Sequence, residues 1–268
     1  MTIYRLHEGQ GPVLVSIPHA GTEIPEEISA RLTPEALQRP DTDWRVDRLY
    51  GFAGALGCSV LAADYSRYVV DLNRPPDDAP LYPGQAGTGL VPIDDFRGRP
   101  LYVNDMTPDM AETFARVEGY WKPYHAALQA ALARIQARFG FAVLWEAHSI
   151  RSRVPRLFEG RLPDLNLGTA DGASCAPALA DAVLQAAEQA IAETGAGYSL
   201  VRDGRFKGGY STRHYGQPAE ARHALQLEIA QASYMDEAPP YAYDAAKAET
   251  LQAVLRPMLQ AAQAWRPI

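Results

Sequence analysis

Cysteine is scarce in this 268-residue chain, and long apolar runs are missing. The two cysteines, Cys58 and Cys175, cannot build a disulfide framework or a cysteine-based zinc site. No run approaches the roughly 18 consecutive apolar residues of a membrane-spanning helix. The first residues lack the basic and apolar blocks of a secretory signal. We therefore expect a soluble, cytoplasmic protein with no membrane partner, in which histidines and carboxylates hold any metal ion.

Basic residues are also fewer than acidic residues. The 25 lysines and arginines face 32 aspartates and glutamates, so the formal net charge is −7. This balance argues against binding to phosphate backbones, and we expect no nucleic-acid partner. The sequence also lacks a GxGxxG turn after a strand, a P-loop, a GxSxG elbow and an HExxH helix. These absences disfavour nucleotide cofactors and serine-hydrolase chemistry.

Apolar segments alternate with helical patterns along the chain. Because 47% of the residues are hydrophobic and no linker or repeat interrupts them, we expect one domain over residues 1–268. Strands alternating with helices predict an α/β fold, in which a largely parallel sheet carries helices on both faces. The predicted strands are 13–18, 58–66, 68–73, 141–149 and 223–230, the predicted helices are 25–37, 43–56, 108–138, 176–194 and 244–264, and the predicted loops are 75–100 and 203–218.

Two of the six histidines lie at the ends of predicted strands. His19 follows the apolar run 13–18, and His148 closes the run 141–149. The carboxyl ends of parallel strands meet at one edge of a sheet, which is where such folds bind ligands. Two imidazoles and one carboxylate can hold a zinc ion and leave a position open for water. The alternative is that each histidine forms structural hydrogen bonds only.

The segment DTDWRVDRLY offers three aspartates, Asp41, Asp43 and Asp47, as the third ligand. Asp43 and Asp47 are four residues apart, so they share one face if the helix has begun by then. The spacing alone leaves the choice between them open.

A second group of polar residues is suited to an anion. Arg67 and the pair Asn73-Arg74 flank one apolar run, and Asp71 between them is placed to hold an arginine. A guanidinium beside an amide presents planar donors that match a carboxylate. A surface ion pair between Arg74 and a nearby aspartate is the alternative.

Two further features are candidates for the site. Arg213 and His214 lie in a glycine-rich segment that is placed to close over a ligand, or that is merely a flexible connection. Glu228 interrupts an apolar strand. A buried carboxylate is costly unless it is paired, so Glu228 is either in a salt bridge or a functional base with a raised pKa.

Seven ordered blocks of the chain resemble the N-formylglutamate amidohydrolase family. They are VSIPHAGTEIP, DTDWRVDRLY, YSRYVVDLNRPPDD, YWKPYHAAL, AHSIRSRVPRLFEGRLPDLNLGTADGASC, RFKGGYSTRHYGQP and HALQLEIAQASYM. The resemblance implies hydrolysis of N-formyl-L-glutamate to formate and L-glutamate, the closing step of one route of histidine degradation. It also implies a three-layer α/β fold with a mixed, largely parallel sheet, similar to zinc exopeptidases of the carboxypeptidase type.

The similarity to exopeptidases implies a role for each candidate residue. Zinc, or another divalent metal, would be held by His19, His148 and an acid, for which we choose Asp47 over Asp43 and Glu23. Glu228 would act as the general base, and Arg67 would polarise the scissile carbonyl. The two carboxylates of the substrate would be bound by Asn73 and Arg74 and by Arg213 and His214.

Two other functions remain open from the sequence. One alternative is a deacylase of another N-acyl or N-formyl acidic amino acid. For example, N-formylaspartate is shorter than N-formylglutamate by one methylene, and a pocket distinguishes the two by only about 1 to 3 kcal/mol of binding free energy. The other alternative is a non-catalytic protein that binds an acidic metabolite. The sequence does not indicate the oligomeric state.

Overall fold

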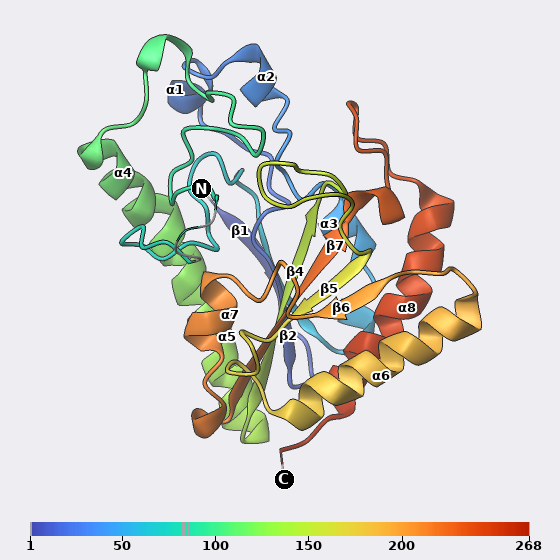
Figure 1. The fold of residues 1–268 in the computed structure, drawn as a ribbon. Helices are drawn as coiled ribbons and strands as arrows, with labels where there is room; N and C mark the ends of the chain where they lie inside the picture. The colour runs from blue at the N-terminus through green and yellow to red at the C-terminus, as the bar shows by residue number, and fades with distance from the viewer. Residues whose placement is uncertain (1, 82–83, 85, 268) are drawn as a thin grey trace.

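The computed structural model describes residues 2–81, 84 and 86–267, and a single seven-stranded sheet forms its centre (Figure 1). The strands are β1 (Tyr4–His7), β2 (Val13–Ile17), β3 (Ser59–Ala63), β4 (Ala142–Ile150), β5 (Leu165–Gly168), β6 (Leu200–Arg202) and β7 (Arg222–Ala230). Their spatial order is β1-β3-β2-β4-β7-β5-β6. Strands β3, β2, β4 and β7 pair in parallel, as do β5 and β6, whereas β1–β3 and β5–β7 are antiparallel. The predicted mixed, largely parallel sheet is therefore confirmed.

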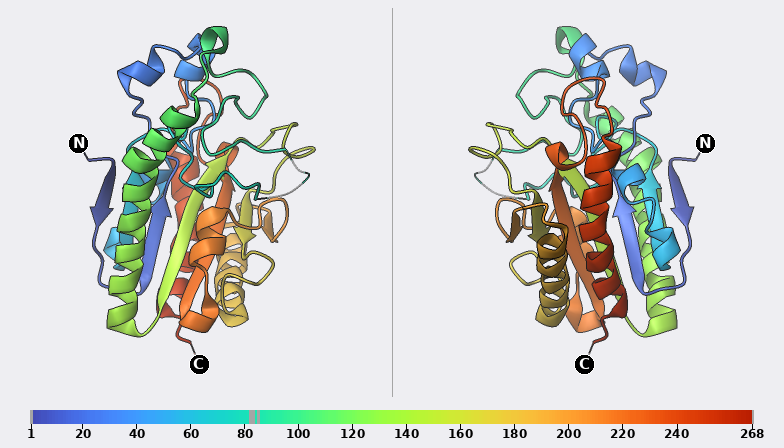
Figure 2. Two further views of the ribbon diagram at one scale, coloured as in Figure 1. Left: turned by 90° about the vertical axis from the view of Figure 1, so that its left-hand side faces the viewer. Right: turned by 90° about the vertical axis from the view of Figure 1, so that its right-hand side faces the viewer.

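Helices cover both faces of the sheet (Figures 1 and 2). The α-helices are α1 (Glu26–Ser29), α2 (Pro34–Leu37), α3 (Val46–Leu49), α4 (Met110–Arg116), α5 (Lys122–Phe139), α6 (Pro177–Thr194), α7 (Tyr210–Tyr215) and α8 (Ala245–Ala264). The other helical turns are η1 (Gly54–Leu56), η2 (Val103–Asp105), the π-helical η3 (Val117–Trp121), η4 (Pro218–Glu220) and η5 (Gln231–Ser233). Helices α3, α6 and α8 pack on one face, and α5 and α7 pack on the other.

Alternation along the central strands produces these two cores. In β4, Val143, Trp145 and Ala147 join the core beneath α6 and α8, while Ala142 and Leu144 join the core beneath α5. Successive side chains of a strand point to opposite faces, so one strand contributes to both layers. The two cores together define a three-layer α/β arrangement.

Most predicted elements are present. The strands predicted at 13–18, 58–66, 141–149 and 223–230 correspond to β2, β3, β4 and β7, and the helices predicted at 176–194 and 244–264 correspond to α6 and α8. The run 108–138 is helical as α4, η3 and α5. Among the described residues of the predicted loop 75–100 there is no helix or strand. Strands β1, β5 and β6 were not predicted, since each is only three or four residues long.

Three predictions were wrong in detail. The segment 68–73 is not a strand but a series of turns, because the backbone N–H groups of Val69 and Asp71 donate to Ser66 and Leu90. The helices predicted at 25–37 and 43–56 are each broken into two short turns. The loop predicted at 203–218 contains helix α7.

Two properties of the chain follow directly from this packing. In the part of the chain that the structure describes, no helix has the length and apolar character needed to cross a membrane. Both cysteines are unpaired and buried.

Burial should make both thiols unreactive. It raises the pKa of Cys58 to about 11 and that of Cys175 to about 12, so neither forms an appreciable amount of thiolate at neutral pH. We expect the native protein to react very slowly with Ellman's reagent and the unfolded protein to release two equivalents at once. Rapid reaction of a native thiol would contradict the packing described here.

Candidate active site

Three parallel strands deliver polar side chains to one edge of the sheet. His19 lies just after β2, whereas His148 and Glu228 are direct register partners on β4 and β7. In β7, Leu227 and Ile229 point into the core beneath α6 and α8, so Glu228 between them points to the other face. Loops gather beyond the carboxyl ends of these strands, at the upper end of both views in Figure 2. The predicted meeting of His19 and His148 is confirmed.

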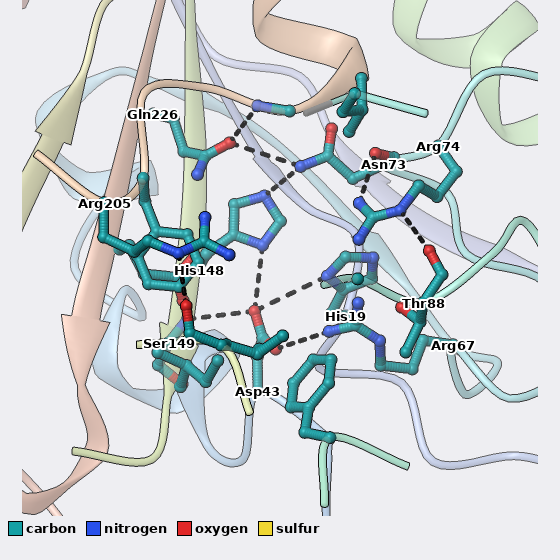
Figure 3. Close-up of a pocket in the computed structure, with 18 of the residues that line it drawn as sticks. His19, Asp43, Arg67, Asn73, Arg74, Thr88, His148, Ser149, Arg205 and Gln226 are labelled. Carbon is teal, nitrogen blue, oxygen red and sulfur yellow. Dashed lines mark hydrogen bonds and ion pairs between the residues drawn. The ribbon is translucent and has the colours of Figure 1, made fainter. Parts of the chain in front are cut away.

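Asp43 completes a buried cluster with the two histidines (Figure 3). Its Oδ2 lies 3.0 Å from Nδ1 of His148 and 3.9 Å from Nδ1 of His19. The three side chains offer ligand atoms within 4.8 Å of one another, and each residue is at most 3% exposed. The backbone N–H of Asp43 donates to the carbonyl of His19, and Oδ2 also accepts from the N–H of Ser149. Two imidazole nitrogens and one carboxylate are a donor set that suits a small divalent cation.

The structure corrects our choice of Asp47 as the acid. Asp47 lies on α3 with its side chain 38% exposed and 3.4 Å from Arg5. Because α3 begins only at Val46, Asp43 precedes the helix, and the four-residue spacing does not place both aspartates on one face. Glu23, the other alternative, is exposed.

Asp71 connects one histidine of the cluster to Arg67. The fully buried carboxylate accepts from Nε2 of His19 at 2.7 Å and from Nη2 of Arg67 at 2.6 Å. Burial alone would raise the pKa of Asp71, but Arg67 and His19 hold it well below its usual range. Burial and the charge of Arg67 lower the pKa of His19 to about 4. His19 is therefore neutral at neutral pH, as a metal ligand must be.

His148 behaves in the opposite way. Burial alone would lower its pKa, but the adjacent carboxylates of Asp43 and Glu146 outweigh burial and raise the pKa to about 10. Without a metal, His148 is therefore an imidazolium that neutralises Asp43. A metal ion must displace this proton, so its binding releases a proton.

Glu228 is a buried carboxylate at the wall of the same pocket. It is 7% exposed and, within the described part of the chain, its carboxylate forms no hydrogen bond or ion pair. Burial raises its pKa to about 8, although the charge of His148 acts against this shift. Of the two possibilities in the sequence, the salt bridge is therefore absent among the described residues, and the raised pKa is present. A divalent cation at the neighbouring cluster would lower this pKa again.

Asn73 and Arg74 also line the pocket. Oδ1 of Asn73 accepts from the N–H of Ser211, which turns Nδ2 towards His148, 3.1 Å from Nε2. Gly209 makes this position possible, because a Cβ there would lie 2.2 Å from Nδ2 of Asn73. Arg74 donates to the carbonyls of Thr88 and Asn73, and among the described residues it forms no ion pair with an aspartate.

Arg213 and His214 are not among the described residues that line this pocket. Both are exposed on α7, where Nε of Arg213 donates to the carbonyl of Gly208 and the ring of His214 stacks on Tyr210 at 4.8 Å. Helix formation turns Ser211 and Thr212 inward and the next two residues outward.

A different arginine of the same glycine-rich segment, Arg205, reaches the pocket. It lines the pocket, and its Nε donates to the carbonyl of Leu157. Figure 3 shows Arg205 and Arg74 approaching the histidine pair from opposite sides. Sequence reasoning missed Arg205, although it lies in the glycine-rich segment that drew attention to Arg213.

The sheet and the pocket define an α/β protein with a candidate hydrolytic metal site at the carboxyl ends of its parallel strands. A buried ligand set, an adjacent buried carboxylate and several arginines are the features of an enzyme that cleaves an anionic substrate. The chain belongs to the N-formylglutamate amidohydrolase family, which matches residues 11–235.

Known proteins resemble the chain over nearly its full length. An N-formylglutamate deformylase of Pseudomonas aeruginosa is 54% identical over 257 residues, which are 96% of this chain and 94% of the relative. A protein of the same name from Pseudomonas putida is 49% identical over 98% of this chain and 96% of its own length. The crystal structure of N-formylglutamate amidohydrolase from Ralstonia eutropha JMP134 matches with a TM-score of 0.82 and 29% identity, and covers 97% of this chain and 98% of that protein.

Proposed function

We propose that this protein hydrolyses N-formyl-L-glutamate to formate and L-glutamate with the help of a divalent metal ion. The relatives named N-formylglutamate deformylase support the substrate. One structural observation carries the chemistry: His19, Asp43 and His148 form a buried ligand set beside the buried carboxylate of Glu228. By the same resemblance, the reaction belongs to histidine degradation.

Zinc is the metal that this donor set favours. Sites with two histidines and one carboxylate are typical of zinc hydrolases, in which a position is left open. When bound, the cation supplies Lewis acidity, which makes water a better nucleophile and stabilises negative charge on the carbonyl oxygen.

Glu228 moves the proton that hydrolysis requires. Its carboxylate accepts a proton from water as the water oxygen attacks the formyl carbon. The carbon–nitrogen bond then breaks, and Glu228 delivers the same proton to the departing amine nitrogen. Arg67, next to the cluster, donates to the carbonyl oxygen as it gains negative charge.

The arginines orient a substrate with two carboxylates. Asn73 and Arg74 bind the α-carboxylate, and Arg205 on the other side of the histidine pair binds the side-chain carboxylate. Two fixed cations on opposite sides restrict the formyl group to one position relative to the ligand set. Arg205 therefore takes the role that the sequence led us to assign to Arg213.

Arg205 and Arg213 form a matched pair for mutation. We expect Arg205→Ala to raise KM for N-formyl-L-glutamate by about 10- to 100-fold, because a charge-assisted hydrogen bond contributes about 1.5 to 3 kcal/mol. Arg213→Ala should leave both KM and kcat unchanged. An unchanged KM in Arg205→Ala, measured by steady-state kinetics, would remove Arg205 from the substrate site.

The proposed function itself is tested by turnover with and without metal. N-formyl-L-glutamate should be hydrolysed faster than N-formyl-L-aspartate and N-acetyl-L-glutamate. Dialysis against a chelator should abolish formate release, and added zinc should restore it. Full activity of a metal-free sample would overturn the metal dependence. Binding of all three compounds without turnover would show that the protein is a binder rather than an enzyme.

A further inference from the structure

Glu146, in β4, is another buried carboxylate, and the mechanism above does not use it. It is fully buried and lies two residues before His148, so both side chains point to the same face of the sheet. Within the described residues, neither of its oxygens has a well-aligned hydrogen bond. Its Oε2 lies 3.3 Å from Nε2 of His148. An isolated buried carboxylate is strongly destabilising, so this contact needs an explanation.

The neighbouring hydroxyl groups are engaged elsewhere. Tyr124, which packs on this face, forms a hydrogen bond with Oγ of Ser16 at 2.9 Å. The hydroxyl of Tyr215 is 2.9 Å from Nδ1 of His125. Gln226, the buried register partner of Glu146 in β7, accepts through its Oε1 from the backbone N–H of Gly209. Among the described residues, His148 is thus the group that forms an ion pair with Glu146.

We propose that Glu146 is a positioning residue that keeps a proton on Nε2 of His148, so that Nδ1 is directed at the metal site. An imidazole that binds a metal through one nitrogen usually donates its other N–H to a carboxylate or carbonyl, which fixes the tautomer and the ring orientation. His19 has the same arrangement, because its Nε2 donates to Asp71 and its Nδ1 points towards Asp43. Each imidazole would therefore have its own buried carboxylate. This inference rests on the metal site of the proposed function.

The pairing has a consequence for Asn73. Its Nδ2 also approaches Nε2 of His148, at 3.1 Å, and is a donor that would favour the opposite tautomer. If Glu146 keeps Nε2 protonated, Nε2 does not accept from Asn73. The amide is then available to the carboxylate of the substrate. Glu146 would in this way support both the ligand set and the substrate-binding group.

The test compares zinc affinity in variants of the full-length protein. Competition with a chromophoric chelator should show that Glu146→Gln, which keeps an acceptor but loses the charge, binds zinc about 10-fold more weakly than the wild type. Glu146→Leu, which has no acceptor, should bind about 100-fold more weakly. Ser16→Ala is the matched control: Ser16 is the register partner of Glu146 in β2, is equally buried, and its hydroxyl forms a hydrogen bond with Tyr124. Its zinc affinity should be unchanged.

A second readout reports the tautomer. In zinc-loaded, 15N-labelled wild-type protein, the His148 ring should show a protonated Nε2 whose hydrogen exchanges slowly, and in Glu146→Leu this hydrogen should exchange faster. Wild-type zinc affinity in both Glu146 variants would overturn the inference and leave the metal site intact. If Glu146→Leu does not fold, wild-type affinity in Glu146→Gln alone overturns it. Failure of the wild type to bind zinc would overturn the metal site and this inference together.

Discussion

Asp43→Asn is expected to abolish zinc binding at stoichiometric concentration and to lower kcat/KM by about 10³-fold or more. Asp43 contacts both imidazoles of the ligand set, and a neutral amide is a poor ligand in its place. Loss of the metal removes several kcal/mol of stabilisation of the transition state, which corresponds to a factor of this size. Zinc content and formate release, measured on the same preparation, check the expectation.

Asp47→Asn is the control for this prediction. Asp47 lies four residues further along the chain, on the surface, where it pairs with Arg5. Exposed ion pairs contribute about 0 to 1 kcal/mol, so its loss should leave stability, zinc content and activity close to those of the wild type. The reverse result, in which only the Asp47 variant loses zinc, would restore the assignment that we first made from the sequence.

Glu228→Gln is expected to lower kcat by about 10²- to 10⁴-fold with little change in KM. Glutamine has nearly the same shape but cannot accept the proton of water, and a general base typically contributes a factor of this size. Because Glu228 is not part of the ligand set, zinc content should stay at the wild-type level. This pattern separates Glu228 from Asp43, whose replacement removes the metal as well.

An exposed glutamate near the other end of the same strand serves as the control. Glu220 precedes β7 and pairs with Arg222 at the surface, so Glu220→Gln should leave kcat unchanged. A Glu228→Gln enzyme that keeps most of its kcat would exclude Glu228 as the general base. Steady-state kinetics on the three proteins decide the question.

The sequence was most informative where strands are long and buried. The apolar runs that became β2, β4 and β7 predicted both the parallel sheet and the edge at which His19 and His148 meet. In the segments WEAHS and LQLEIA, alternate side chains point to the same face of the sheet, and we did not use this information. It places Glu146 on the same face as His148, and Gln226 on the same face as Glu228.

Prediction from the sequence failed where short segments are shaped by tertiary contacts. The segment 68–73 has the composition of a strand, but Asp71 is bound to His19 and Arg67 and the backbone turns around it. The composition of a segment does not reveal which distant residue will satisfy its polar groups.

By itself, the sequence determined the layer order, the strand-end histidines and the family, because these depend on periodicity and on ordered blocks of residues. Only the tertiary structure decided between Asp43 and Asp47, and between Arg205 and Arg213. Each choice depends on where a helix begins and which way its side chains turn, as the start of α3 at Val46 and the outward face of α7 show. One residue of difference in a helix start rotates a side chain by about 100°, and neighbouring elements fix that start.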